Sequence, residues 1–166
     1  NAGITGGGAT VGAAYDFGTG LTAAFGAQTT ESAVFTDESM DAYAFNTAYT
    51  GDNYGVSVTY GVVETSTTNE DTYTAFNAYY LPDGAGLPSL SVGYEIGDIG
   101  GAAATVDEKT SFMVGLSWDE VGPGSAGIAL GHSSTVEGSD EEYQYEAYYS
   151  YPINDGMTIT PLIYSK

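Results

Sequence analysis

The sequence of 166 residues contains no cysteine and only two Lys+Arg residues. Without cysteine, neither a disulfide framework nor a metal site with thiolate ligands can form. With 22 Asp+Glu residues the formal net charge is −20. This charge excludes the basic surface on which proteins bind nucleic acid, and it excludes a polybasic membrane anchor. Because His132 is the one histidine, any imidazole chemistry must use it.

Long apolar runs are also missing, and no stretch of about 18 apolar residues predicts a transmembrane helix. The abundant residues are glycine, with 24 copies, and tyrosine, with 15. A hydrophobic content of 42% is too high for acidic disorder. The length is enough for one domain with a sizeable core, and we treat residues 1–166 as a single domain.

Apolar and small polar residues alternate with a period of two along most of the chain. From Tyr54 to Val62 the even positions hold Tyr, Val, Val, Tyr and Val, whereas the odd positions hold Gly, Ser, Thr and Gly. This pattern is typical of a β-strand with one apolar and one small polar face. It predicts ten strands, at residues 9–17, 20–29, 41–50, 53–63, 72–81, 88–97, 109–118, 125–134, 143–151 and 157–165.

Turn residues divide these strands into five hairpins. Gly, Asn, Asp and Pro gather at short turns near residues 19, 52, 85, 122 and 155, as tight turns require. The connections between hairpins, at residues 29–40, 64–71, 98–108 and 133–142, are longer and acidic. Short turns at one end and long loops at the other are typical of outer-membrane barrels. The sequence therefore predicts an all-β, antiparallel up-and-down transmembrane β-barrel, with about ten strands here as part of a larger barrel.

The positions of the acidic residues favour this fold. Three acids fall within predicted strands, namely Asp16, Glu95 and Glu146, and all three are on the polar face. The other acids fall in the turns and loops, so none of them needs to face lipid, where a charge costs on the order of 2 kcal/mol or more.

Aromatic residues gather at both ends of the predicted strands. Those beside the tight turns are Tyr15, Phe17, Tyr49, Tyr54, Tyr80, Trp118, Tyr149 and Tyr151, and those near the long loops are Tyr43, Tyr73, Phe112, Tyr143 and Tyr145. Two such belts would lie at the two membrane–water boundaries. The simpler explanation is the ordinary preference of aromatic residues for strands.

The segment from Tyr145 to Tyr164 (YEAYYSYPINDGMTITPLIY) resembles the C-terminal hairpin of carbohydrate-selective (OprB-like) porins, and in particular the cyanobacterial outer-membrane porins. The segment from Asp52 to Tyr60 (DNYGVSVTY) is similar to another of their strands. The resemblance implies a homotrimeric outer-membrane pore for small solutes. Such porins have more strands, about 16, and end on an aromatic residue rather than on Ser-Lys, so we expect an internal or C-terminal piece of the barrel. No residue here matches the arginine-rich constriction loop of porins.

Candidate pore-lining residues are Asp16, Glu95 and Glu146. Carboxylates that face a lumen attract cations and repel anions, although they would equally suit pairing with basic residues elsewhere in the barrel. The dense acidic stretch from Glu137 to Glu142 suits loose binding of Ca²⁺ or Mg²⁺, but lacks the spacing of a calcium loop. No cofactor or dedicated metal site is predicted.

The most favoured function is an outer-membrane porin, not an enzyme, that passes small solutes or inorganic cations by diffusion and contacts outer-membrane lipid. The alternative is a secreted acidic β-rich protein that assembles into a surface layer or filament, since exposed edge strands favour assembly. A third hypothesis is a barrel hydrolase that uses His132 with a neighbouring serine. One histidine without a motif favours instead a histidine at the rim of the barrel.

Overall fold

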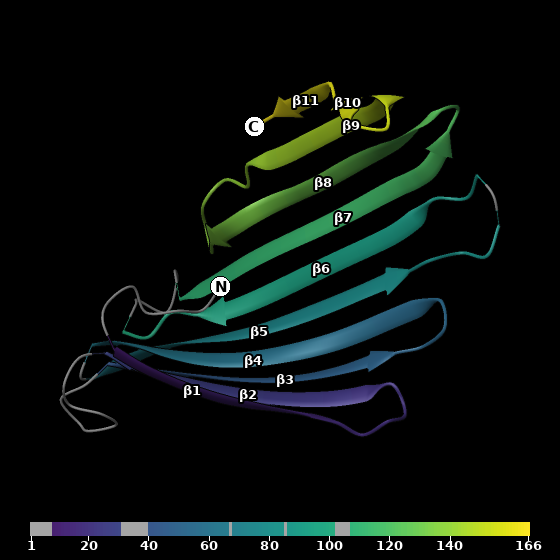
Figure 1. Ribbon diagram of the computed structural model, residues 1–166. Helices are drawn as coiled ribbons and strands as arrows, with labels where there is room; N and C mark the ends of the chain where they lie inside the picture. The colour runs from purple at the N-terminus through teal and green to yellow at the C-terminus, as the bar shows by residue number, and fades with distance from the viewer. Residues whose placement is uncertain (1–7, 31–39, 67, 85, 102–106) are drawn as a thin grey trace.

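The computed structural model describes residues 8–30, 40–66, 68–84, 86–101 and 107–166, which form one antiparallel β-sheet (Figure 1). Its strands are β1 (Gly8–Asp16), β2 (Leu21–Thr30), β3 (Asp41–Thr50), β4 (Tyr54–Ser66), β5 (Asn69–Tyr80), β6 (Ser89–Asp98), β7 (Glu108–Val121), β8 (Gly124–Val136), β9 (Tyr143–Asn154), β10 (Met157–Ile159) and β11 (Leu162–Ser165). From β1 to β9 each strand pairs with the next along the chain, and β10 and β11 both pair with β9. The predicted all-β, antiparallel up-and-down fold is confirmed.

The sheet is not closed into a barrel. Within the described residues β1 pairs only with β2, while β10 and β11 pair only with β9. Figure 1 shows these two edges on opposite sides of a curved, twisted sheet. The chain in this structure is therefore an open sheet.

The last predicted strand, residues 157–165, is two strands rather than one. It is interrupted at Thr160 and Pro161, because proline has no N–H to donate to a ladder. The Pro161 carbonyl still accepts a hydrogen bond from the Tyr149 N–H at 3.2 Å. As a result β10 and β11 follow one another along the same edge of β9.

One predicted loop, residues 64–71, is wrong. β4 continues to Ser66 and β5 begins at Asn69, with Glu64 opposite Glu70. The turn is held by the Ser66 hydroxyl, which accepts hydrogen bonds from the N–H groups of Thr68 (3.3 Å) and Asn69 (3.1 Å). The threonines that made this segment read as a polar loop also suit a strand. Two other predicted loops, residues 29–40 and 98–108, lie partly outside the described residues, which omit 31–39 and 102–106.

The pairing register divides the strand residues between two faces. One row of cross-strand partners runs Leu21, Tyr49, Val56, Ala78, Val92, Val114, Leu130 and Tyr145. The adjacent row on the other face runs Asp16, Thr22, Ala48, Ser57, Asn77, Gly93, Met113, Gly131 and Gln144. We call these the apolar face and the small-residue face.

Neither face is covered, so the chain has almost no conventional core. Among the described residues the buried hydrophobic ones are Ala27 and Ala42, and large apolar side chains such as Phe45 and Ile128 are 50% exposed. The accessible area of the chain is 10631 Å², against about 7,800 Å² for a compact monomer of this mass. The core that the chain length allows has not formed, because most of the large apolar side chains lie on one face of a single layer that no second layer covers.

Candidate functional site: the small-residue face

Glycine and tyrosine interlock across neighbouring strands of the small-residue face. Three tyrosine rings lie over the glycine opposite them in the next strand, in the pairs Gly55–Tyr79, Gly97–Tyr73 and Gly127–Tyr148. A Cβ atom added to Gly55 would lie 2.3 Å from the Tyr79 ring, and one added to Gly127 would lie 2.4 Å from the Tyr148 ring. Because these glycines have no side chain, the large tyrosine rings can lie flat against the sheet and project little from the small-residue face.

The three candidate pore-lining carboxylates all lie on this face, on β1, β6 and β9. Asp16 is in register with Thr22, and its Oδ1 accepts a hydrogen bond of 2.8 Å from the Gly18 N–H. Glu95 is half-buried, with Ala75 and Ser111 as its cross-strand partners. Glu146 is exposed. The structure thus places the three on one face but on separate strands.

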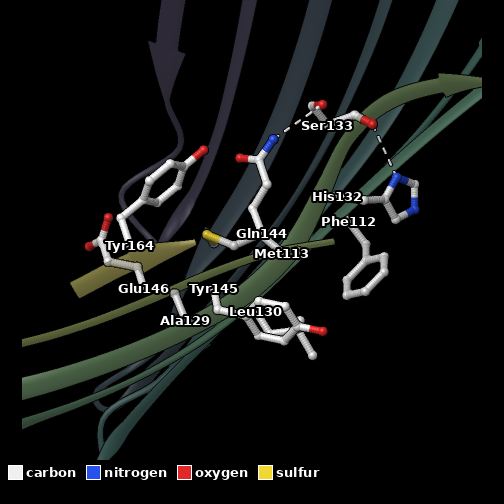
Figure 2. Close-up of a pocket in the computed structure, with 11 residues that line it drawn as sticks. Phe112, Met113, Ala129, Leu130, His132, Ser133, Gln144, Tyr145, Glu146 and Tyr164 are labelled. Atoms are coloured by element: carbon white, nitrogen blue, oxygen red, sulfur yellow. Dashed lines mark hydrogen bonds between the residues drawn. The ribbon is translucent and has the colours of Figure 1, made fainter. Parts of the chain in front are cut away.

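Glu146 borders a shallow hollow of about 270 Å³ in the sheet between β7 and β11. Figure 2 shows Met113, Gln144, Glu146 and Tyr164 projecting from the small-residue side, with Phe112 and Leu130 on the opposite side of the ribbon. Tyr164 is the cross-strand partner of Glu146. The hollow is bordered by the carboxylate of Glu146, the amide of Gln144 and the phenol of Tyr164. Such polar groups suit a hydrated cation or a polar solute.

Three tyrosines near the loop end of the sheet each donate a hydrogen bond to an acid two residues earlier. The hydroxyls of Tyr43 and Tyr73 donate to Asp41 and Asp71, each at 3.1 Å, and the Tyr143 hydroxyl donates to Glu141. Residues two apart in a strand share a face, so the spacing acid-x-Tyr brings the two side chains together in β3 and β5, whereas Glu141 lies just before β9. Sequence reasoning missed this spacing, although it is visible in the sequence.

Two of these acids are buried and take further hydrogen bonds. Asp71 is 7% exposed, and its Oδ1 accepts a bond of 3.0 Å from the Gly100 N–H. Asp41 is 4% exposed, and its own N–H donates to the Glu64 carboxylate at 3.0 Å. Both acids therefore fasten strand ends, a role that their predicted position in or at the edge of the long loops did not indicate.

Tyr73 does not lie on the face that the aromatic-belt interpretation requires. It is opposite Gly61 and Gly97 on the small-residue face. In β5 it is Thr72, Thr74 and Phe76 that share the apolar face, since they are in register with apolar residues of β4. Two of these three residues are threonines, so the apolar pattern of this strand is weak in the sequence.

His132 is buried, with 6% of its area exposed, and is not exposed at a rim. Its ring packs edge-to-face against Phe112 at 4.8 Å between centroids and against Tyr143 at 6.0 Å. Its Nδ1 lies 3.1 Å from the Ser133 carbonyl oxygen and 3.4 Å from the Thr135 hydroxyl. The ladder between β7 and β8 bulges next to this residue, between the pairs Thr110–Thr135 and Phe112–His132, and the hydrogen bonds of the histidine hold this irregular segment.

Acidic residues cluster at the loop end without forming a compact metal centre. Glu108, Glu137 and Glu141 border a second hollow of about 240 Å³. Within the described ranges, no three His, Asp or Glu side chains are grouped closely enough to share a metal ion. Lys166 and Glu142 form an exposed ion pair of 3.9 Å, which contributes little to stability. Loose binding of Ca²⁺ or Mg²⁺ at residues 137–142 stays a prediction.

No protein-family model, curated protein or solved structure matches this chain. In the part of the chain that the structure describes, no helix is both long enough and apolar enough to cross a membrane. The two faces of the sheet are therefore the basis on which a function is proposed.

Proposed function

We propose that this chain forms part of the wall of an outer-membrane porin. The apolar face lies against lipid, and the small-residue face lines an aqueous lumen. The observation that carries the proposal is the acid-free row of apolar side chains from Leu21 to Tyr145, which crosses eight strands. A parallel row runs from Tyr54 through Tyr80, Leu90, Leu116, Ile128 and Ala147 to Ile163. Water is a poor solvent for such a surface, whereas lipid is a good one.

The strand lengths suit a membrane. The strands from β1 to β9 have between 9 and 14 residues, and about 9–11 tilted residues cross a bilayer. The acids that share the apolar face, such as Asp98 and Glu108, lie at strand ends. An apolar band bounded by charged ends is what a spanning sheet needs.

The same arrangement gives the pore a preference for cations. The net charge of −20 produces a negative potential that concentrates cations near the protein. Asp16, Glu95 and Glu146 bring part of this charge onto the small-residue face. Small inorganic cations are therefore the favoured solutes, and a homotrimer is the assembly that the sequence resemblance implies.

The test is a planar-bilayer recording of the detergent-extracted chain with a salt gradient across the membrane. Stepwise conductance with a cation-selective reversal potential is the expected result. Silence from protein with an intact β-sheet signal in circular dichroism would overturn the proposal. Buffer without protein, and heat-unfolded protein in the same detergent, are the controls.

One observation favours a second function, a secreted β-rich protein that assembles into a surface layer or filament. Among the described strands, β1 at one side of the sheet and β10 and β11 at the other leave an open edge, and open edges pair with other chains. Detergent separates the two functions, because a porin needs detergent to stay dispersed and a surface protein stays dispersed or forms filaments in buffer alone.

A further inference from the structure

Two tyrosine rings meet across the tight turn between β3 and β4 (Figure 1). Tyr49, near the end of β3, and Tyr54, the first residue of β4, have ring centroids 5.8 Å apart and an angle of 40° between the ring planes. We propose that this pair is a site of covalent modification, at which a one-electron oxidant joins the two rings into a dityrosine cross-link. The inference is independent of the porin function proposed above, because it rests on the geometry of this turn alone.

The turn holds the two residues in a fixed relation. The Gly51 N–H donates a hydrogen bond of 2.8 Å to the Tyr54 carbonyl. In the ladder Tyr49 is opposite Val56, so Tyr54 is its diagonal neighbour on the same face of the sheet. Diagonal neighbours on one face are within reach of aromatic side chains. The two rings can therefore react without any rearrangement of the backbone.

Gly51 leaves the space that the ring of Tyr54 occupies. A Cβ atom added to Gly51 would lie 2.6 Å from Cε1 of Tyr54, so this ring lies over the glycine, on the side of β3. The two phenol groups are also close enough to interact with one another. Because Cε1 and Cε2 are bonded to the carbon that carries the hydroxyl, this approach brings together the ring carbons that couple in dityrosine.

The same geometry favours Tyr49 over the other tyrosine that neighbours Tyr54. Tyr80 is the cross-strand partner of Tyr54 in β5, and it is 46% exposed. The ring of Tyr54, however, lies over Gly51, which follows β3 on the other side of β4. Tyr80 is thus an internal comparison, a tyrosine that is adjacent in the ladder but from which the ring of Tyr54 is directed away.

Both rings of the pair are accessible from solution. Tyr49 is 38% exposed and Tyr54 is 43% exposed. Both lie beside the polar turn residues Asp52 and Asn53, at the ends of their strands, where a dissolved oxidant reaches them. The chain has no cysteine, so no thiol is present to be oxidised first.

The reaction joins one ortho carbon of each ring. Each phenol loses one electron and one proton, which leaves a phenoxyl radical on each side chain. The two unpaired electrons form a carbon–carbon bond between the ortho carbons. Each of these carbons then loses its hydrogen as a proton while the oxygen of the same ring gains one, which restores both phenols. With a haem peroxidase as the one-electron oxidant, the two electrons and two protons reduce one hydrogen peroxide to two molecules of water.

The product is a covalent bridge at the end of the β3–β4 hairpin. A chain without cysteine has no disulfide for this purpose. Cross-links that close short loops restrain the unfolded chain less than those that close long ones. The bridge between Tyr49 and Tyr54 therefore acts mainly on local opening of the turn.

The test treats the detergent-extracted chain with a haem peroxidase and hydrogen peroxide across a protein dilution series. Dityrosine is measured by its fluorescence, and monomer and dimer are separated by denaturing electrophoresis. Proteolysis before aspartate residues places Tyr49 in peptide 41–51 and Tyr54 in peptide 52–70. These two peptides stay joined only where a cross-link connects them, and fragmentation in the mass spectrometer identifies the linked residues.

Three variants isolate the geometry. Tyr54→Phe removes one phenol and keeps the ring, whereas Gly51→Ala keeps both phenols and displaces the Tyr54 ring. Tyr80→Phe is the matched control on the same face. Because coupling depends on holding the two reacting groups together, we expect Tyr54→Phe and Gly51→Ala to lower the dityrosine of the monomer about five-fold or more, and Tyr80→Phe to change it less than about two-fold.

In the parent we expect peptides 41–51 and 52–70 joined through Tyr49 and Tyr54 in the monomer, at a yield that does not change with dilution. Dityrosine that forms only between copies and falls with dilution would overturn the proposal. A cross-link from Tyr54 to Tyr80, or a monomer without dityrosine that keeps its circular dichroism spectrum, would overturn it as well. If Gly51→Ala alters the spectrum, Tyr54→Phe still decides, since an unchanged dityrosine yield in that variant contradicts the assignment.

Discussion

A charge placed at Val58 tests whether the apolar face meets lipid. Val58 is the middle apolar residue of β4, with Val56 and Tyr60 on either side along the same face, and it is 38% exposed. We expect Val58→Arg to lower the free energy of unfolding by about 2–4 kcal/mol, the cost of arginine near the middle of a membrane barrel. This equals a change of about 30-fold to 700-fold in the unfolding equilibrium constant at 1.4 kcal/mol per tenfold.

The matched control is Ser57→Arg, at the residue that precedes Val58 in β4. Ser57 lies on the small-residue face, in register with Ala48 and Asn77, where water would solvate the new charge. We expect a loss of less than about 1 kcal/mol there, since lumen positions tolerate charge.

The assay is urea unfolding of each variant from phospholipid vesicles, followed by tyrosine fluorescence and circular dichroism. The reasoning would be refuted if both variants lost the same free energy, or if the Val58 variant lost no more than about 0.5 kcal/mol. A loss that small is typical of a surface position in water. Such a result would favour the surface-assembly function.

Three further variants test individual features. Gly55→Ala should lower the free energy of unfolding by about 1–3 kcal/mol, because the new methyl group would be overpacked against the tyrosine ring opposite it. The control Gly26→Ala should leave the free energy of unfolding unchanged, because its Cβ would meet no atom within 4 Å. Urea unfolding measures both variants. Asp71→Asn should lower the free energy of unfolding by about 1–2 kcal/mol, because a buried hydrogen-bond acceptor is weakened. The control is Glu70→Gln at an exposed residue, which should leave the midpoint of thermal unfolding unchanged. Glu95→Gln should move the reversal potential under a salt gradient toward zero, and Glu70→Gln should move it less; equal shifts would argue against a lumen position for Glu95.

The alternation of side chains made most of the fold predictable. In residues 54–62 each apolar residue falls on one face and each small residue on the other, and the register confirms this. Strand ends were less predictable, because Glu64 and Glu70 pair across a tight turn in a segment whose composition resembles a loop. The break at Pro161 follows from its missing N–H. In the sequence, however, a single proline does not distinguish the end of a strand from a local interruption, because an edge strand tolerates proline.

The candidate site was predictable only as a set of residues on one face. Parity along each strand places Asp16, Glu95 and Glu146 on the small-residue face, but parity carries no information about the distance between strands. The ring of Tyr79 over Gly55 depends on which residues of two strands are opposite, and that register is a tertiary property. The burial of His132 depends on Phe112 and Tyr143, which come from two other strands.

The strictly sequential order of β1 to β9 has a consequence for how the sheet forms. From β1 to β8 every strand finds its partners among its immediate neighbours in the chain, so most contacts close short loops, and short loops cost little entropy. One hairpin can therefore add to the growing edge after another, without waiting for a distant segment to arrive. Because the pairing is sequential, a hairpin inserted between two others would widen the sheet by two strands. All pairings except the one at the point of insertion would stay intact.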